Sequence, residues 1–236
     1  MKIIKVKNTQ EGFEICKKLL YETVSKNSVL FLSGGSTPKT LYQILAKEKT
    51  LKVGAVALID ERFGAKLHEN SNEKMIHDTG LVKYLDENKI RFYPILQGKS
   101  MEETARDYDE ALRYLFNYFP KSIGILGVGV DGHTAGIPAI EKISKKILND
   151  KSSLVSFYDD KESFYKQRIT LTFLALSRLD EIIILVFGKD KKKALQLMFT
   201  YSASSGQESI AQIPSRFLAT KEINDKITLI TDQAVK

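Results

Sequence analysis

The chain has 236 residues, of which 43% are hydrophobic, and this length and composition fit either one large α/β domain or two small ones. Its 36 Lys and Arg and 29 Asp and Glu give a net charge of +7, and the positive charges gather in the runs KISKK and KDKKK. No zinc-ligand spacing, RNA-stacking motif or long basic arm accompanies these runs, which argues against nucleic acid as the partner. The longest apolar run, IIILVF, is much shorter than the roughly 18 residues that span a bilayer, and the chain has a single cysteine, so we expect a cytoplasmic protein that does not span a membrane.

Apolar runs typical of strands alternate along the chain with segments of helical periodicity. We expect strands at residues 3–6, 29–32, 56–59, 90–93, 123–127, 154–157, 169–172, 182–187, 217–219 and 228–230. The clearest helices are predicted at residues 10–25, 38–46, 101–118 and 189–200. Runs such as VLFL are apolar on both faces, which is typical of a mostly parallel sheet covered by helices on both sides. Because no linker interrupts this pattern, we predict a single α/β domain over residues 1–236, with its ligand beyond the carboxyl ends of the strands.

The first informative loop is SGGSTP, residues 33–38, which lies between the strand VLFL and a predicted helix. Gly34 and Gly35 allow backbone N–H groups to face a ligand, and Ser36 and Thr37 offer hydroxyl groups at the positive end of the helix. We interpret this loop as an anion-binding turn. An ordinary glycine-rich turn between a strand and a helix is the alternative for this segment alone.

The second loop begins with Asp60, Glu61 and Arg62 at the end of a strand. Three consecutive charged side chains cannot all face a core, so we expect at least some of them to face solvent or a site. Arg62 would bind phosphate or stabilise an oxyanion, and Asp60 or Glu61 would orient it or act as an acid or base. A salt bridge without a catalytic role is the alternative. His68 and His77 have no Cys or other His at metal-ligand spacing, so we predict no metal site.

The third loop, GVGVDGHTAG at residues 127–136, follows the apolar run SIGILGV and presents Asp131 and His133. Histidine is the side chain whose ordinary pKa suits proton transfer near neutrality, and Asp131 is placed to accept a hydrogen bond from His133 and fix its tautomer. The chain has no GxSxG motif, so water activated by His133 is favoured over a serine nucleophile. A structural histidine is the alternative.

Two further segments, QRITLT and FGKDKKKAL, place Arg168 and Lys191 beside strands. Lysine in the first turn of a helix is electrostatically unfavourable, and this cost is more understandable if an anion binds between the ammonium and the helix end. We therefore regard both residues as candidate anion ligands. Surface charge without a binding role is the alternative.

In their order and content these motifs resemble the glucosamine-6-phosphate isomerase/6-phosphogluconolactonase family, which has a Rossmann-like parallel sheet. The resemblance extends over residues 33–234 and is carried by SGGSTPKTLY, DERF with a following SN, GVGVDGHTAG, RITLT, GKDKKKAL and IPSRFLA. Two features favour the lactonases of this family. Arg62 stands where the deaminases typically carry tyrosine, and Thr134 and Ala135 follow the histidine where the deaminases have a run that contains a catalytic glutamate. Gly136 stands where lactonases commonly have serine.

The resemblance implies hydrolysis of 6-phospho-D-glucono-1,5-lactone to 6-phospho-D-gluconate in the pentose phosphate pathway. It implies that His133 is the general base, that Asp131 is its partner and that Arg62 lies near the lactone. It implies phosphate binding by Gly34, Gly35, Ser36, Thr37, Arg168 and Lys191. No cofactor is required, the expected partner is a sugar phosphate, and we expect a monomer or a small homo-oligomer. A deaminase or isomerase acting on another sugar phosphate, and a non-catalytic sugar-phosphate-binding protein, are the alternatives.

Overall fold

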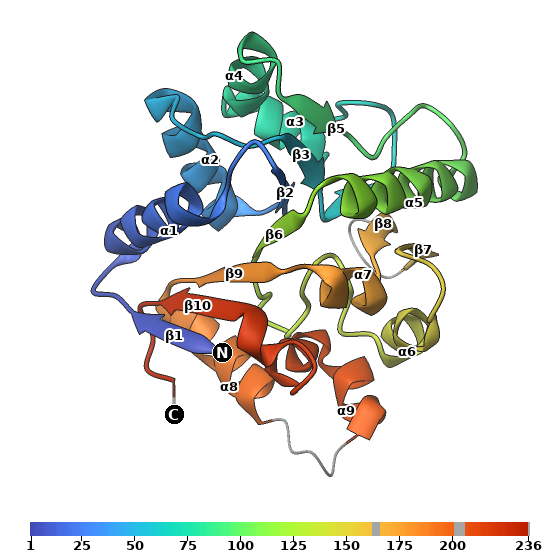
Figure 1. The fold of residues 1–236 in the computed structure, drawn as a ribbon. Helices are drawn as coiled ribbons and strands as arrows, with labels where there is room; N and C mark the ends of the chain where they lie inside the picture. Colours follow the sequence, from blue (N-terminus) through green and yellow to red (C-terminus); the bar gives the residue numbers. More distant parts are fainter. Residues whose placement is uncertain (162–165, 201–205, 236) are drawn as a thin grey trace.

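The computed structural model describes residues 1–161, 166–200 and 206–235 of the chain (Figure 1). Seven strands form one sheet in the order β1-β10-β9-β6-β2-β3-β5, and every neighbouring pair is parallel. These strands are β1 (Lys2–Lys5), β2 (Ser28–Leu32), β3 (Ala55–Leu58), β5 (Arg91–Tyr93), β6 (Lys121–Leu126), β9 (Glu181–Val186) and β10 (Ile227–Thr231). The α/β fold with a mostly parallel sheet is therefore confirmed.

Helices cover the sheet from both sides, and Figure 1 shows α1 and α2 on one side of β2 and β6 and α5 on the other. The α-helices are α1 (Thr9–Thr23), α2 (Ser36–Glu48), α3 (Asn72–Asp78), α4 (Leu81–Glu87), α5 (Met101–Tyr118), α6 (Glu141–Asn149), α7 (Phe173–Arg178), α8 (Lys192–Phe199) and α9 (Gly206–Gln212). The short 3-10 helices are η1 (Lys189–Lys191), η3 (Pro214–Ala219) and η4 (Asn224–Lys226). The four helices predicted from apolar periodicity are confirmed, and the last of them divides into η1 and α8. None of the helices in the described ranges is long and apolar enough to cross a membrane.

The direction in which the chain crosses the sheet reverses at its centre. From β2 the chain passes through β3 to β5 at one edge, whereas from β6 it passes through β9 and β10 in the opposite direction. β2 and β6 are direct neighbours, and Leu32 pairs with Ile125 near the carboxyl ends of both. Parallel sheets bind ligands at such a switch point, because the two loops that leave it diverge and open a crevice. These loops are the SGGSTP and GVGVDGHTAG segments.

A second, antiparallel sheet continues from the first. β4 (Asp60–Arg62) follows β3 after one residue and pairs with β8 (Gln167–Leu171), which in turn pairs with β7 (Val155–Asp159). In this sheet Arg62 lies directly opposite Arg168. The apolar pattern predicts β7 and β8 but misses β4, because three charged residues in a row have no strand periodicity.

The predicted strand at residues 217–219 is wrong. These residues belong to η3, which begins at Pro214. Proline suits the first position of a helix, whereas its missing N–H disfavours a strand within a sheet. The Phe217 ring packs edge-on against Phe173 of α7, with centroids 4.8 Å apart, so the apolar character of this segment serves packing between helices.

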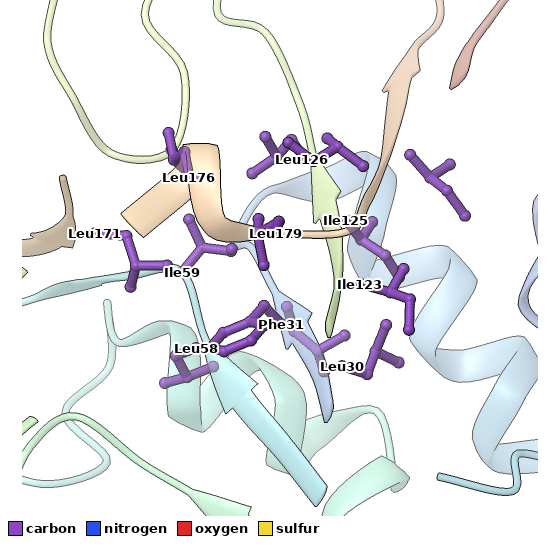
Figure 2. Packing of buried hydrophobic residues seen from close by; sticks show 14 of the residues in the cluster. Leu30, Phe31, Leu58, Ile59, Ile123, Ile125, Leu126, Leu171, Leu176 and Leu179 are labelled. Atoms are coloured by element: carbon purple, nitrogen blue, oxygen red, sulfur yellow. The ribbon is translucent and has the colours of Figure 1, made fainter. Parts of the chain in front are cut away.

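The hydrophobic core joins the two sheets (Figure 2). Leu171 of β8 and Leu179, which ends α7, lie beside Ile59, the residue between β3 and β4. A Cβ at Gly124 of β6 would lie only 2.8 Å from the Leu179 side chain, so glycine at this position lets α7 approach the large sheet closely. This packing fixes β4 and β8, which carry Arg62 and Arg168, relative to β6 and the loop after it.

Candidate active site

A cavity of about 400 Å³ opens at the carboxyl ends of β2, β3, β6 and β9. It is lined by residues 33–38, Asp60, Arg62, residues 127–130, His133, Ala135, Gly136, Arg168, Leu185, Phe187 and Lys191. The structure thus brings nearly all of the predicted site residues together. The exceptions are Asp131, which contacts His133 from outside this cavity, and Glu61, which is buried elsewhere.

The turn from β2 into α2 forms one wall of the cavity. Gly35 is the N-cap residue of α2 and has φ +112°, a conformation that glycine adopts readily. Because the cap is a glycine, it has no side chain to occupy the N–H groups of the first helical turn. The N–H groups of Ser36 and Thr37 are therefore available to an anion at the positive end of a 13-residue helix.

Asn72 links this turn to β4. A Cβ at Gly34 would collide with the Asn72 amide, so only a glycine lets the turn approach it so closely. The buried Asn72 donates from Nδ2 to the carbonyl oxygen of Asp60 over 2.8 Å. Ser71 is the N-cap of α3, and its side chain accepts a hydrogen bond from the Lys74 N–H. Sequence reasoning missed the contact of Asn72 with the cavity wall, because that contact joins residues far apart in the chain.

Asp60 and Arg168 form an ion pair inside the cavity, with Oδ2 and Nη1 3.6 Å apart and the two side chains 8% and 18% exposed. The backbone of Gly136 packs directly on Asp60, and a Cβ at residue 136 would collide with the carboxyl group. Gly136 also has φ +72°, which favours glycine. The loop that carries His133 is therefore held next to the Arg168 guanidinium, whose planar fork suits a phosphate.

Lys191 enters the cavity from the loop after β9. Its ammonium donates to the carbonyl oxygen of Val128 over 3.1 Å, which joins this loop to the one that follows β6. The N–H of Gly188 donates to both carboxylate oxygens of Asp232, over 3.0 and 3.2 Å, and this anchors the start of η1. Lys191 is the N-cap residue of α8, close to the predicted first turn. With Arg168, it places a second positive charge on the cavity wall.

Asp131 and His133 form a hydrogen-bonded pair. The His133 Nδ1 lies 2.6 Å from Asp131 Oδ1, and the His133 backbone N–H donates to the same oxygen over 3.1 Å. The hydrogen bond from His133 lowers the pKa of the Asp131 carboxyl to about 2, so this group is ionised at neutral pH. An ionised carboxylate only accepts, so we assign the proton to Nδ1, which leaves Nε2 as a proton acceptor. A Cβ at Gly129 would collide with the imidazole, which explains why this position is a glycine.

Arg62 lines the cavity from β4. Its Nη1 donates to the carbonyl oxygen of Asn70 over 2.8 Å, and its own carbonyl oxygen lies 2.8 Å from His68 Nε2. The segment after β4 therefore supports Arg62, and His68 contributes to that support. The three cations Arg62, Arg168 and Lys191 face one carboxylate, Asp60, so the cavity favours an anionic ligand.

Glu61 departs from the prediction. Its side chain is fully buried, and it accepts hydrogen bonds from the backbone N–H groups of Arg62, Asn72 and Glu73 over 2.6 to 2.8 Å. Burial raises the pKa of this carboxyl to about 7 against the opposing effect of those three donors. Successive side chains of a strand alternate between faces, so Glu61 points away from the cavity that Asp60 and Arg62 line. It holds the start of α3 against β4 and has no direct role in chemistry.

The Glu61→Gln variant is expected to lose about 1–3 kcal/mol of unfolding free energy, because the amide nitrogen cannot accept from the buried N–H groups. Since the folded state raises the pKa of Glu61 from 4.5 to about 7, folded protein binds this proton more tightly than unfolded protein. The contribution of Glu61 to stability therefore decreases as the pH rises through this interval. Urea unfolding at pH 5 and pH 8 measures both effects. A difference between wild type and variant that grows with pH would contradict the assignment.

The cavity also has an apolar floor, which was not predicted. Leu185 of β9 and Phe187, the next residue but one, line it. Phe187 packs edge-on against Phe13 of α1, with ring centroids 5.8 Å apart, and a Cβ at Gly12 would collide with its ring. The run IIILVF predicts a buried strand. It does not predict which of its residues line the cavity, because that depends on where the neighbouring strands end.

Outside the cavity, Cys16 is fully buried in α1, and burial raises the pKa of its thiol to about 12, so this residue is structural. Within the described residues, no group of three or more His, Cys, Asp or Glu side chains could hold a metal ion.

Known proteins resemble this chain over most of its length. Residues 11–228 match the family model described as glucosamine-6-phosphate isomerases/6-phosphogluconolactonase. A 6-phosphogluconolactonase of Nostoc sp. is 31% identical over 196 residues, which cover 79% of this chain and 75% of the relative. A glucosamine-6-phosphate deaminase of Streptococcus uberis is 27% identical over 213 residues, which cover 85% and 87%. The structure of a 6-phosphogluconolactonase from Plasmodium vivax has the same fold, with a TM-score of 0.76 and 23% identity over 97% of this chain and 89% of that chain.

The family match spans nearly the whole chain and includes every residue that lines the cavity. The likeness to the Plasmodium vivax structure shows the same fold. The chain belongs to the glucosamine-6-phosphate isomerase/6-phosphogluconolactonase family.

Proposed function

We propose that this protein hydrolyses 6-phospho-D-glucono-1,5-lactone to 6-phospho-D-gluconate. One observation carries the proposal: a single cavity joins a helix N-terminus and two cations, suited to a phosphate, to a histidine whose carboxylate partner leaves Nε2 able to accept a proton. Membership of the family supports an activity of the lactonase or the isomerase type. The cavity residues favour the lactonase.

The phosphate end of the substrate binds at the turn after β2. The N–H groups of Ser36 and Thr37 face it from α2, and Arg168 and Lys191 supply positive charge from two other loops. The phosphate is remote from the bond that breaks, so its binding energy orients the lactone carbonyl toward His133.

His133 then acts on water as a general base. Nε2 takes a proton from the water molecule as its oxygen forms a bond to C1 of the lactone, and the carbonyl electrons move onto the carbonyl oxygen. When the tetrahedral intermediate collapses, the bond between C1 and the ring oxygen breaks, and the proton on His133 passes to that oxygen. Arg62 lines the same cavity and stabilises the negative charge that develops on the carbonyl oxygen.

Thr134 and Ala135, which distinguish the two activities in the family resemblance, make hydrogen bonds within the fold. Thr134 is buried and donates from Oγ1 to the carbonyl oxygen of Gly127 over 2.8 Å, and Thr170 donates to the carbonyl oxygen of Ala135. The nearest glutamate in sequence, Glu141, begins α6 and is not among the cavity residues. This loop therefore supplies no carboxylate at the position where the related deaminases have their catalytic glutamate.

The Asp131→Asn variant is expected to lower kcat about 10-fold, which corresponds to about 1.4 kcal/mol of transition-state stabilisation. The amide keeps the size of the side chain but no longer fixes the proton on Nδ1, so part of the population holds the unproductive tautomer. Steady-state hydrolysis of the lactone at pH 7.5 measures this change. Asp86→Asn, an exposed substitution on α4, is the matched control and should behave as wild type. An unchanged kcat in Asp131→Asn would show that the pair is not needed for catalysis.

The proposed function is tested with freshly prepared lactone, because the lactone also hydrolyses without enzyme. We expect the enzymatic rate to exceed the blank, with 6-phosphogluconate as the product. A rate equal to the blank, together with release of ammonia from glucosamine 6-phosphate, would assign the protein to the deaminases. Binding of 6-phosphogluconate with neither activity would identify a non-catalytic sugar-phosphate-binding protein.

A further inference from the structure

A second cavity of about 340 Å³, here called the annex, adjoins the first. The two cavities share His133, Gly136 and Arg168 as lining residues. The imidazole thus stands in the wall between them, with its side chain 49% exposed. A base in this position faces both cavities.

The charges that line the annex differ in sign from those of the main cavity. Arg62, Arg168 and Lys191 outnumber the single carboxylate there, whereas the annex has the carboxylates of Asp131 and Asp160 beside Arg168. A second phosphate or carboxylate ligand would be repelled by this arrangement. An uncharged molecule would not.

The remaining wall of the annex is apolar, and it consists of Pro138, Ala139, Ile140 and the ring of Tyr158. The Tyr158 hydroxyl donates to the carbonyl oxygen of Gly136 over 2.6 Å, which holds the ring in place. Carboxylates that accept hydrogen bonds, set opposite an apolar wall, suit a ligand with both O–H groups and C–H faces. A small polyol has this chemistry.

Ile140 adds an independent observation. It is the N-cap residue of α6, a position where Ser, Thr, Asp and Asn are favoured and isoleucine is disfavoured. The residue is nevertheless 38% exposed and lines the annex. Its apolar side chain is therefore available to contact a ligand there.

We infer that the annex binds a small uncharged polyol, which replaces water as the acceptor of the acyl group. This inference rests on the proposed lactonase function. His133 Nε2 takes the proton of a polyol hydroxyl as its oxygen bonds to C1 of the lactone. The bond from C1 to the ring oxygen breaks, and the proton passes to that oxygen. The product is an ester of 6-phosphogluconate with the polyol, and no oxidant or further reactant is consumed.

The test supplies the lactone and glycerol to the enzyme, followed by rapid quenching and mass spectrometry of acid and ester. We expect glyceryl ester at a rate at least about fivefold above the blank without enzyme. Glycerate, which matches glycerol in size but carries a charge, should give no ester above its blank. Equal ester formation from both alcohols would overturn the inference. Hydrolysis above the blank without glyceryl ester overturns the inference alone, whereas lactone loss at the blank rate refutes the proposed function as well.

The Ile140→Ser variant separates the annex from folding, because serine is a better N-cap than isoleucine and should not lower the melting temperature. We expect its ratio of ester to acid to fall about fivefold through loss of the apolar contact. Ile140→Val, which keeps the apolar side chain, should stay within about twofold of wild type. An unchanged ratio in Ile140→Ser would show that the polyol does not bind in the annex.

Discussion

Replacement of His133 by alanine is expected to lower kcat/KM for lactone hydrolysis by at least about 100-fold, the usual cost of losing a general base. The imidazole is held by Asp131 through Nδ1 and contacts the cavity that Arg168 and Lys191 line. In the proposed mechanism, its removal takes away the group that accepts the proton of water but leaves the phosphate-binding residues intact. The affinity for 6-phosphogluconate should therefore change much less than the rate, and titration calorimetry measures it.

His77→Ala is the matched control, since His77 is an exposed residue of α3 that lies outside the cavity. Its kcat/KM should equal that of wild type. If His133→Ala retained activity within about threefold of wild type, another group would have to activate the water, and the proposed mechanism would fail even if the lactone remained the substrate.

The Arg168→Met variant is expected to raise the dissociation constant of 6-phosphogluconate about 10- to 100-fold, because a charged hydrogen bond to a phosphate contributes about 1.5–3 kcal/mol. The same variant should raise KM far more than it lowers kcat, since in the proposed mechanism Arg168 binds the phosphate end of the substrate, which does not react. Arg168→Lys keeps the positive charge beside Asp60 but loses the planar fork, so its affinity should lie between those of wild type and Arg168→Met.

Arg178→Met, on the exposed side of α7, controls for the loss of an arginine elsewhere and should bind as wild type does. In Arg168→Met the Asp60 carboxylate loses its ion-pair partner, which lowers stability. Thermal unfolding of this variant checks that it is still folded under the conditions of the binding measurement. A well-folded variant with unchanged affinity would remove Arg168 from the phosphate site.

The parts of the site that follow strand ends were predictable from the sequence. The runs VLFL and SIGILGV stop at glycines, and such glycines permit the turns and close approaches that place backbone and side chains at the edge of a parallel sheet. The predicted turn at residues 33–38 and the residues Asp60, Arg62 and His133 do meet in one cavity. Their chemical roles stay predictions until the variants are measured.

The parts that depend on contacts between distant segments were not predictable. The burial of Glu61 follows from the backbone N–H groups of Asn72 and Glu73, which only the fold brings to it. The apolar residues 217–219 would suit either a strand or a helix. They form part of a helix in which Phe217 packs against Phe173, a contact that the local sequence does not reveal. Local periodicity contains no information about which partner a segment will meet.

The pairing of Arg62 opposite Arg168 in the small sheet links ligand binding to the stability of the fold. Like charges directly opposite one another on adjacent strands destabilise a sheet, and Asp60 lies 3.6 Å from Arg168 as its ion-pair partner. A bound dianion would relieve the repulsion, so ligand binding and folding are thermodynamically linked. Removal of the Arg168 charge should weaken ligand binding and also lower stability, because it leaves the buried Asp60 carboxylate without its ion-pair partner.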